Sequence, residues 1–303
     1  MNNLSRIVVL ISTYNGEKFL CEQLNSLLAQ DAGSVDIFLR DDGSSDGTQK
    51  ILNYYSQHYS NIRWFRGKSN IKPAHSFLEL IQRVSTSYDF YFFCDQDDYW
   101  NPDKITSAIS SFNNNITFPG LYYCATELVD ENLNNIGKDY REYRYSSNLV
   151  YSFLRGSLIT GCTICINRGL LNALRQYSPS PVLMHDSWVH LLCLSLGGVI
   201  IADPTPHIKY RQHTSNVLGI HKISLYNRLK NGLKRKTIYR DMASQIVENF
   251  HIENHEVYKF LLSFINYDNN FYNRISFLRY ISKQNIELIS KVYICLKIVF
   301  RLY

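Results

Sequence analysis

Residues 88–100 read YDFYFFCDQDDYW. The first half of this stretch is rich in aromatic side chains and has one charge, at Asp89, which is typical of a strand buried on both faces of a parallel sheet. Three carboxylates, Asp95, Asp97 and Asp98, then follow within four positions. Carboxylates this close raise one another's pKa, and a bound cation relieves that cost. The stretch therefore predicts a buried strand that ends in a cation site.

Oxygen ligands at the end of a strand suit Mg²⁺ or Mn²⁺, which commonly also bind the phosphates of a substrate. In open α/β sheets, ligands bind beyond the carboxyl ends of the strands, so a phosphorylated donor is expected at this place. The structural alternative is an acidic turn, in which Asp98 or Asn101 caps the helix that begins near Pro102.

Strand and helix signals alternate through the first hundred residues. Apolar runs at residues 7–11, 35–39 and 62–65 join the aromatic stretch as predicted strands. Helical spacing of apolar residues follows each of the first three runs. This alternation predicts an α/β fold with a doubly wound, mainly parallel sheet flanked by helices.

A second acidic loop follows the second predicted strand. Asp41 and Asp42 lie there, and a carboxylate at a strand end can accept hydrogen bonds from a nucleobase N–H or from ribose hydroxyls. The alternative is an ordinary turn at Asp42-Gly43-Ser44, with Asp46 as the N-cap of the next helix.

The middle of the chain is less regular. Residues 121–125 and 199–202 are interpreted as strands, residues 158–166 as a strand or the edge between a strand and a helix, and residues 130–148 as a polar loop. Residues 184–188 open a strongly apolar helix, and Asp186 lies at its start. We consider this carboxylate either a catalytic base or an N-cap.

The chain changes character after residue 216, where a basic block and then helical patterns begin. We predict two regions, a catalytic domain at residues 1–216 and a basic helical region at residues 217–303 that contacts a membrane surface or a second copy. The last helix, near residues 287–301, is basic and amphipathic. It is interpreted either as an interfacial helix or as a helix packed on the domain with a solvated basic face.

The net charge of +6 favours anionic partners such as nucleotides or lipid head groups. Nucleic acid is not expected, because few aromatics accompany the basic block of residues 222–240. The seven cysteines are scattered and interpreted as reduced thiols of a cytosolic protein. No leader pattern and no bilayer-length apolar stretch is found.

Three motifs occur in an order that resembles family 2 glycosyltransferases: VLISTYN at residues 9–15, DDGSSDGT at residues 41–48 and DQDD at residues 95–98. The resemblance covers roughly residues 5–216 and implies the GT-A fold. The segment CDQDDYW, with YRQH at residues 210–213, is similar to the bacterial rhamnosyltransferase branch. Thr13 replaces the family's usual proline. The Gln-Arg-Trp signature of processive synthases is absent, which argues against a polymer synthase.

The resemblance implies a role for each matching residue. The nucleobase and ribose pocket would be lined by Thr13, Tyr14, Asn15 and Glu17, with Asp41 facing the base and Asp42 nearby. Lys72 would meet the diphosphate. Asp95 would hold the ribose or the water shell of the metal, with Gln96 beside it among the donor-binding residues. Asp97 would bind the metal, with Asp95 and His213 as further candidate ligands. Asp186 would be the catalytic base.

Two of these roles have alternatives. His185, beside Asp186, is a second candidate for the base. His213 is alternatively a hydrogen-bonded loop histidine.

The expected function is an inverting, metal-dependent sugar transfer with Mg²⁺ or Mn²⁺ as cofactor. The donor is expected to be dTDP-L-rhamnose, with a UDP-hexose as the alternative. The acceptor would be a lipid-linked saccharide of bacterial surface polysaccharide (O-antigen or capsule) synthesis, at the cytoplasmic face of the inner membrane. The alternative of another class is a non-catalytic subunit that binds a nucleotide-sugar or a glycan.

Overall fold

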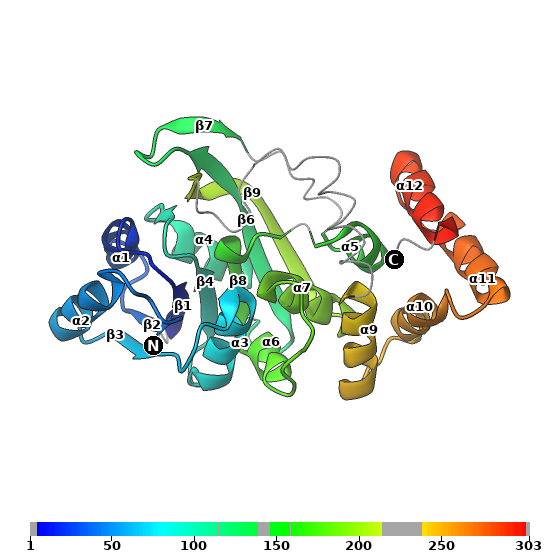
Figure 1. Cartoon of the computed structure of the whole chain (residues 1–303), viewed down its shortest axis with the longest axis horizontal. Coiled ribbons are helices and arrows are strands. Elements are labelled where there is room, and N and C mark those ends of the chain that lie inside the picture. Colours follow the sequence, from blue (N-terminus) through cyan, green and yellow to red (C-terminus); the bar gives the residue numbers. More distant parts are fainter. Residues whose placement is uncertain (1–4, 114, 139–145, 158, 214–237, 301–303) are drawn as a thin grey trace.

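The computed structural model describes residues 5–113, 115–138, 146–157, 159–213 and 238–300. One large sheet forms its centre, with helices on both faces (Figure 1). In chain order the strands are β1 (Ile7–Thr13), β2 (Val35–Asp41), β3 (Ile62–Arg66), β4 (Phe90–Cys94), β5 (Tyr99–Trp100), β6 (Gly120–Val129), β7 (Asn135–Lys138), β8 (Ile164–Asn167) and β9 (Val199–Arg211). Their order in the sheet is β3-β2-β1-β4-β8-β6-β9-β5, with β7 paired to β6.

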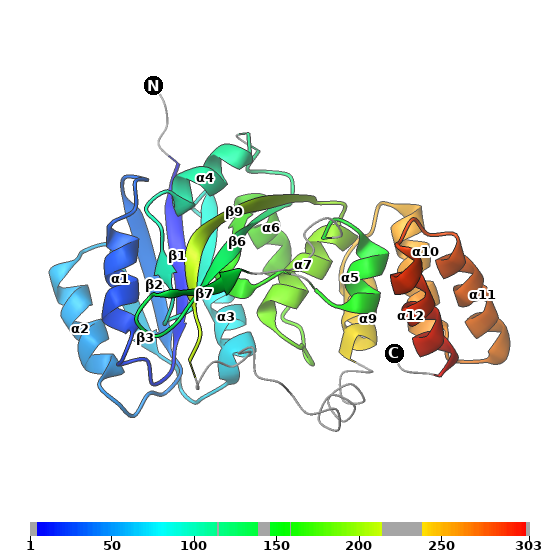
Figure 2. The ribbon, with the colours of Figure 1, turned by 90° about the horizontal axis from the view of Figure 1, so that it is seen from above.

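The helices that precede the last strand, β9, in the chain are α1 (Leu20–Leu28), α2 (Thr48–His58), α3 (Lys72–Arg83), α4 (Lys104–Ser111), α5 (Leu149–Arg155), α6 (Arg168–Leu174) and α7 (His185–Ser195). A short 3-10 turn, Gly161–Thr163, precedes β8. The C-terminal helices are α9 (Ile238–Asn249), α10 (His255–Asn266), α11 (Phe271–Ser282) and α12 (Leu288–Val299). They extend away from the sheet, at the opposite end of the molecule from α1 and α2 (Figure 2).

The first four strands of the sheet order, from β3 to β4, are parallel, so their carboxyl ends lie at one edge. In register, Thr13 of β1 lies beside Asp41 of β2, and Ile11 of β1 lies beside Cys94 of β4. The loops that follow these three strands therefore start next to one another. Beyond β4 the sheet is mixed, because β8 is antiparallel to both β4 and β6, while β9 is parallel to β6.

The central strands are apolar on both sides because both faces of the sheet are covered. In β1, Val8 and Leu10 join one apolar cluster, which includes side chains of α3, α6 and α7. The alternate residues Val9 and Ile11 join a second cluster, with α1, α2 and α4. The aromatic strand β4 divides its side chains between the two clusters in the same way. The predicted alternation of strands and helices is confirmed, together with the burial of β4.

β9 is longer than the sequence indicated. The pattern predicted a strand at residues 199–202 that ends before two prolines, yet β9 continues through Pro204 and Pro206. Its pairing with β6 shifts register near Cys124 and Ala125. An irregularity of this kind lets a strand accommodate residues that cannot donate to the ladder. Arg211 at its end is therefore brought back beside the loop after β4.

Several other local expectations are wrong. Residues 130–148 were expected to be a loop, but they contain β7. Neither Asp98 nor Asn101 caps α4, because its N-cap residue is Asp103. Asp186 is not the N-cap of α7, because Met184 occupies that position and α7 begins at His185. Helices α5 and α6 were not expected, since each is short and has few of the periodic repeats that reveal a helix.

The predicted domain boundary at residue 216 and most of the basic block lie outside the described residues. Met242 and Ile246 of α9 and Phe260 of α10 belong to the same apolar cluster as Val8 and Trp188. The division at residues 1–216 and 217–303 stays a prediction. In the described part of the chain, no helix has the length and hydropathy needed to cross a bilayer.

The side chain of Asn167 connects β8, the start of β6 and α6. Its Oδ1 accepts from the backbone N–H of Gly120 and Leu170, each at 3.0 Å. Its Nδ2 donates to the carbonyl oxygens of Asn115 at 3.0 Å and Phe118 at 2.7 Å. The residue is fully buried, so water cannot replace these partners.

We predict that Asn167→Ala lowers the free energy of unfolding by about 3 kcal/mol, because it leaves several buried backbone groups unpaired. Urea unfolding followed by circular dichroism measures this. Asn249→Ala is the control, since the side chain of this exposed residue donates to the Gln245 carbonyl oxygen in its own helix, and its loss should cost under about 0.5 kcal/mol. Equal losses in the two variants would contradict the assigned role of Asn167.

Candidate active site

The loop after β4 holds the three carboxylates that the sequence singled out. Asp97 is partly buried, and its Oδ2 lies 2.8 Å from Nε2 of His213. Asp98 is fully buried, and its Oδ1 accepts from the backbone N–H of Arg211 at 3.1 Å. Asp95 is also partly buried. The structure therefore brings together two of the predicted metal ligands, Asp97 and His213, although they lie far apart in sequence.

Arg211 fixes this loop from behind. Its Nε donates to the Asp97 carbonyl oxygen at 2.7 Å, and its guanidinium also bonds the side chain of Glu22 and the carbonyl oxygen of Glu131. The guanidinium lies 4.6 Å from the ring centre of Phe19. The side chain is 1% exposed, so these contacts satisfy a buried cation. Arg211 thus connects β9 to the acidic loop, α1 and the β6–β7 hairpin.

The acidic loop is electrostatically crowded. Burial, followed by the charges of Asp97 and Asp186, raises the pKa of Asp95 to about 7. Burial, followed by Asp97 and Asp95, raises the pKa of Asp98 well above its usual value. Asp186 lies in the first turn of a different helix, α7. A Cβ placed on Gly161 would lie 3.8 Å from the Asp186 Cβ, and the next residue, Cys162, has its Sγ within 4.8 Å of ligand atoms of Asp95 and Asp98. The start of α7 therefore lies near the acidic loop.

The residues present fit a divalent cation. Oδ2 of Asp98 is buried and has no hydrogen-bond partner within the described residues. Ligand atoms of Asp95, Asp98 and Cys162 lie within 4.8 Å of one another. Burial and the charges of Asp98 and Asp95 raise the pKa of the Cys162 thiol well above its usual value, which disfavours the thiolate that a metal requires. Carboxylate oxygens are therefore the better ligands, as Mg²⁺ and Mn²⁺ prefer.

Asp186 lies in the first turn of α7, where the helix dipole favours an anion. It is largely buried, and its Oδ1 accepts from the Ser187 hydroxyl at 3.2 Å. The neighbouring His185 is a poor base. Its ring stacks on Phe77 with centroids 4.0 Å apart, and neither ring nitrogen has a hydrogen-bond partner within the described chain. Burial lowers the pKa of His185 to about 3.

The loop after β1 is held by the loops beside it. Gln96 accepts from the backbone N–H of Tyr14 at 2.9 Å and donates to its carbonyl oxygen at 3.1 Å. Asn15 has a positive φ of 48°, and its Oδ1 accepts from the backbone N–H of Ser45 at 2.9 Å. Glu17 accepts from the backbone N–H of Gly47 at 2.8 Å. Tyr14 itself remains 48% exposed, which leaves its ring free to contact a ligand.

Asp41 is fully buried at the end of β2. It accepts hydrogen bonds from the Thr13 hydroxyl at 3.3 Å, the Ser44 hydroxyl at 2.5 Å and the Gln49 amide at 3.0 Å. These contacts place Asp41 and Thr13 side by side, while their roles in a nucleobase pocket stay predictions. They also use much of the carboxylate's bonding capacity, so its main effect in this structure is to order the loop.

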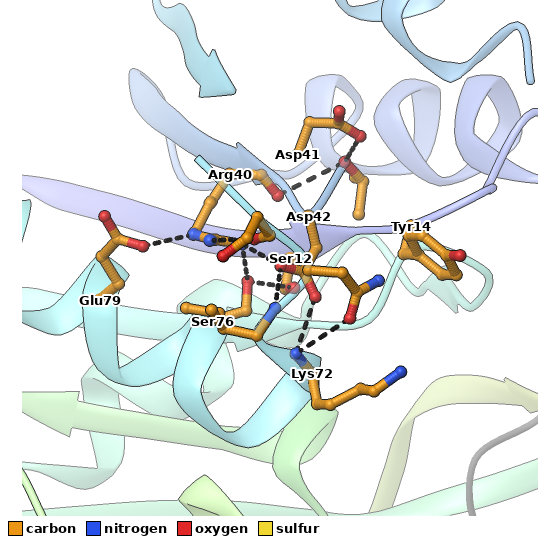
Figure 3. Close-up of polar contacts among 12 residues, drawn as sticks. Ser12, Tyr14, Arg40, Asp41, Asp42, Lys72, Ser76 and Glu79 are labelled. Atoms are coloured by element: carbon orange, nitrogen blue, oxygen red, sulfur yellow. Dashed lines mark hydrogen bonds and ion pairs between the residues drawn. The ribbon is translucent and has the colours of Figure 1, made fainter. Parts of the chain in front are cut away.

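Asp42 belongs to a buried network around Arg40 (Figure 3). The Arg40 guanidinium donates to Asp42 at 2.5 Å, to Glu79 at 2.6 Å and to the Ser76 hydroxyl at 3.2 Å. Asp42 also accepts from the backbone N–H of Lys72 at 2.9 Å. Lys72 has a positive φ of 69°, and its side chain extends away from Asp42 (Figure 3). Asp42 therefore shapes the turn that presents Lys72.

Sequence reasoning missed Arg40, Arg211 and the burial of Asp98. A signal existed for Arg40, because a cation directly before two carboxylates at a strand end has partners available. Nothing in the sequence pattern indicated that Arg211 lies beside Asp97. The assigned roles in binding and catalysis stay predictions. The structure shows that the loops after β1, β2 and β4 and His213 meet at one edge of the sheet. The start of α7 packs beside them, with the His185 ring 5.6 Å from that of Phe93 in β4.

Comparison with known proteins decides the family. The model of glycosyl transferase family 2 matches residues 8–174. The chain belongs to glycosyl transferase family 2. The dTDP-rhamnosyl transferase RfbG of Shigella flexneri is 30% identical to this glycosyltransferase over 254 residues, which cover 78% of this chain and 83% of the relative. An uncharacterized glycosyltransferase of Rickettsia typhi is 26% identical over 247 residues, which cover 80% and 76%.

Solved structures confirm the fold of this glycosyltransferase. TarS of S. aureus (residues 1–349, in complex with UDP-GlcNAc) superimposes with a TM-score of 0.62 at 17% identity, covering 98% of this chain and 82% of that one. The mannosyltransferase PcManGT from Pyrobaculum calidifontis, in complex with GDP-Man and Mn²⁺, gives 0.54 at 14% identity, with coverage of 100% and 82%. The predicted GT-A fold with a C-terminal helical region is confirmed.

We predict that His185→Leu makes the glycosyltransferase less sensitive to acid. The folded state holds His185 neutral with a pKa of about 3, against an ordinary value of 6.5, so the unfolded state binds its proton first. Stability contributed by this difference is present above pH 6.5 and is lost as the pH falls toward 3. Thermal unfolding from pH 7 to pH 4 should therefore show a shallower loss in the variant.

The control for this prediction is His251→Leu, which changes an exposed histidine and should leave the pH dependence unaltered. His190, whose pKa burial lowers to about 4, keeps its own contribution in both variants. Identical pH profiles for wild type and His185→Leu would show that the His185 ring is not held neutral in the fold.

Proposed function

We propose that this glycosyltransferase moves L-rhamnose from dTDP-L-rhamnose to a hydroxyl of a lipid-linked saccharide, with inversion at the anomeric carbon. The observation that carries the proposal is the acidic loop after β4, where the Asp97 Oδ2 lies 2.8 Å from the His213 Nε2. Ligand atoms of Asp95, Asp98 and Cys162 also lie within 4.8 Å of one another there. The similarity to a dTDP-rhamnosyl transferase over most of both chains supports the choice of donor. The acceptor is proposed from the expected role in bacterial surface polysaccharide synthesis at the cytoplasmic face of the inner membrane.

The chemistry requires a base and a stabilised leaving group. Asp186 accepts the proton of the acceptor hydroxyl, whose oxygen then attacks the anomeric carbon. The bond from that carbon to the diphosphate oxygen breaks on the opposite face, and the nucleoside diphosphate leaves. A single displacement of this kind inverts the anomeric centre. Asp186 is suited to this role because the α7 dipole and the Ser187 hydroxyl favour its ionised form.

Asp97, Asp95 and His213 would hold a Mg²⁺ or Mn²⁺ ion, with Asp98 behind them. When bound, the ion acts as a Lewis acid that neutralises charge on the leaving diphosphate. Tyr14, Asn15 and Glu17 line the loop proposed to receive the nucleoside. Lys72, exposed at the start of α3, is proposed to meet the diphosphate.

The donor prediction is tested with a panel of nucleotide-sugars. We expect the fastest release of nucleoside diphosphate from dTDP-L-rhamnose in the presence of a lipid-linked acceptor, and little release when the divalent cation is chelated. Preferential turnover of a UDP-hexose would replace the proposed donor. Binding of nucleotide-sugars with no released diphosphate for any donor would support the non-catalytic alternative.

The residue roles are tested with Asp186→Asn and Asp97→Asn. Asp186→Asn should reduce kcat by at least about a hundredfold, the scale of general-base catalysis, while donor binding measured by calorimetry persists. Asp97→Asn should instead weaken Mn²⁺-dependent donor binding. Asp31→Asn removes an exposed carboxylate and is the control. Full transfer activity in either active-site variant, with normal thermal unfolding, would rule out the assigned role.

A further inference from the structure

Helix α12 exposes an apolar surface. We define the α12 apolar face as Leu288, Ile289, Val292, Leu296, Val299 and Phe300, whose exposed fractions lie between 50% and 76%. Residues spaced by three and four positions share one side of a helix, so these six form one continuous strip. Contiguous exposed strips of large apolar side chains mark interaction sites in soluble proteins.

The packing of α12 explains why this strip is exposed. The helix contacts the rest of the protein through Ile294 and Ile298, which are fully buried with Phe277 and Ile281 of α11 in the main apolar cluster. Ser290 faces inward with them. The sequence offered two interpretations of this helix, an interfacial helix or a helix packed on the domain with a solvated basic face. The structure shows that α12 packs on the chain, and that the side it leaves to solvent is largely apolar. Helix α12 therefore has apolar side chains both on the side that packs on α11 and on the side exposed to solvent.

Cationic side chains border the strip. The Arg155 guanidinium lies 4.5 Å from the ring centre of Tyr293, and the Lys297 ammonium lies 5.2 Å from the same ring. The Lys291 ammonium donates to the Ser282 carbonyl oxygen at 3.0 Å. Residues 283–300 contain three lysines and a single acid, Glu287. An apolar strip with a cationic border and a half-exposed tyrosine matches the interface of an anionic bilayer.

The charges decide between a bilayer and a second copy of the chain. If two copies paired through this face, each would bring its lysines and arginine toward those of the other, and the repulsion would oppose the apolar contact. An anionic lipid surface gains from both features, because basic residues near such a surface each contribute to attraction. Helix α12 also lies at the opposite end of the molecule from α1 and α2, which follow the proposed nucleoside-binding loops (Figures 1 and 2).

We propose that the α12 apolar face docks this protein on an anionic lipid bilayer, with the helix lying in the plane of the interface. The inference concerns a surface outside the catalytic site. It bears on the lipid-linked acceptor only if the proposed function holds, but lipid binding is measured without sugar transfer. The two proposals can therefore fail separately.

The test uses the full chain and two kinds of vesicle, phosphatidylcholine alone and phosphatidylcholine with phosphatidylglycerol. In co-sedimentation, the protein should bind the anionic vesicles and should bind the neutral vesicles much more weakly. The double variant Val292→Glu/Leu296→Glu should lower the anionic partition coefficient at least about tenfold, because two charges replace apolar contacts. Tyr54→Glu, at a 56% exposed position on α2, is the matched control and should bind as wild type does.

Both altered positions are exposed, so circular dichroism melting should be unchanged by the double variant. Sedimentation velocity without lipid tests the competing explanation, that this face joins two copies of the chain. A wild-type dimer that becomes monomeric in the double variant, with no vesicle binding by either, would make the face a contact between copies and overturn the proposal. Equal vesicle binding by wild type and double variant would also overturn it. If the wild-type protein binds anionic vesicles but releases no nucleoside diphosphate from any donor, the result counts against the proposed function and leaves the docking proposal standing.

Discussion

The site depends on carboxylates being kept close together in a poorly solvated place. Burial and the neighbouring carboxylates raise the pKa of Asp95 and of Asp98, because both effects disfavour the ionised form. The backbone N–H of Arg211, from which Asp98 accepts a hydrogen bond, acts in the opposite direction and lowers the pKa of that carboxyl. The His213 ring holds the neighbouring Asp97 side chain in place. The raised pKa values show that ionising all three carboxylates is costly in the absence of a partner of opposite charge. A divalent cation, as proposed, would remove that cost.

The parallel half of the sheet makes this concentration of charge possible. Because β1, β2 and β4 are in register and point the same way, one edge collects three loops from distant parts of the sequence. Arg40 and Arg211, each about 1% exposed, then anchor the second and third of these loops from inside the protein. Buried arginines held by several acceptors are costly to disturb, so the loops keep their shape before any ligand binds.

The sequence predicted the parts of the structure that depend on local patterns. Alternating apolar runs and helical spacing indicated the first four strands and three helices, and the acidic motifs were placed at the correct strand ends. It failed where distant segments decide the conformation. β9 crosses two prolines because its partner β6 shifts register, and Asp98 is buried because Arg211 returns to it. The sequence also could not predict which side of α12 packs on the protein. A helical projection of this helix is apolar over most of its circumference, so the position of Ile294 alone does not identify the buried side.

The double hydrogen bond between Gln96 and the Tyr14 backbone has a thermodynamic consequence. Gln96 lies between Asp95 and Asp97, so these two hydrogen bonds join the loop proposed to receive the nucleoside to the loop proposed to receive the ion. Ordering either loop lowers the entropic cost of ordering the other, and such coupling is reciprocal. The nucleoside should then tighten the ion, and the ion the nucleoside, even when no diphosphate connects them.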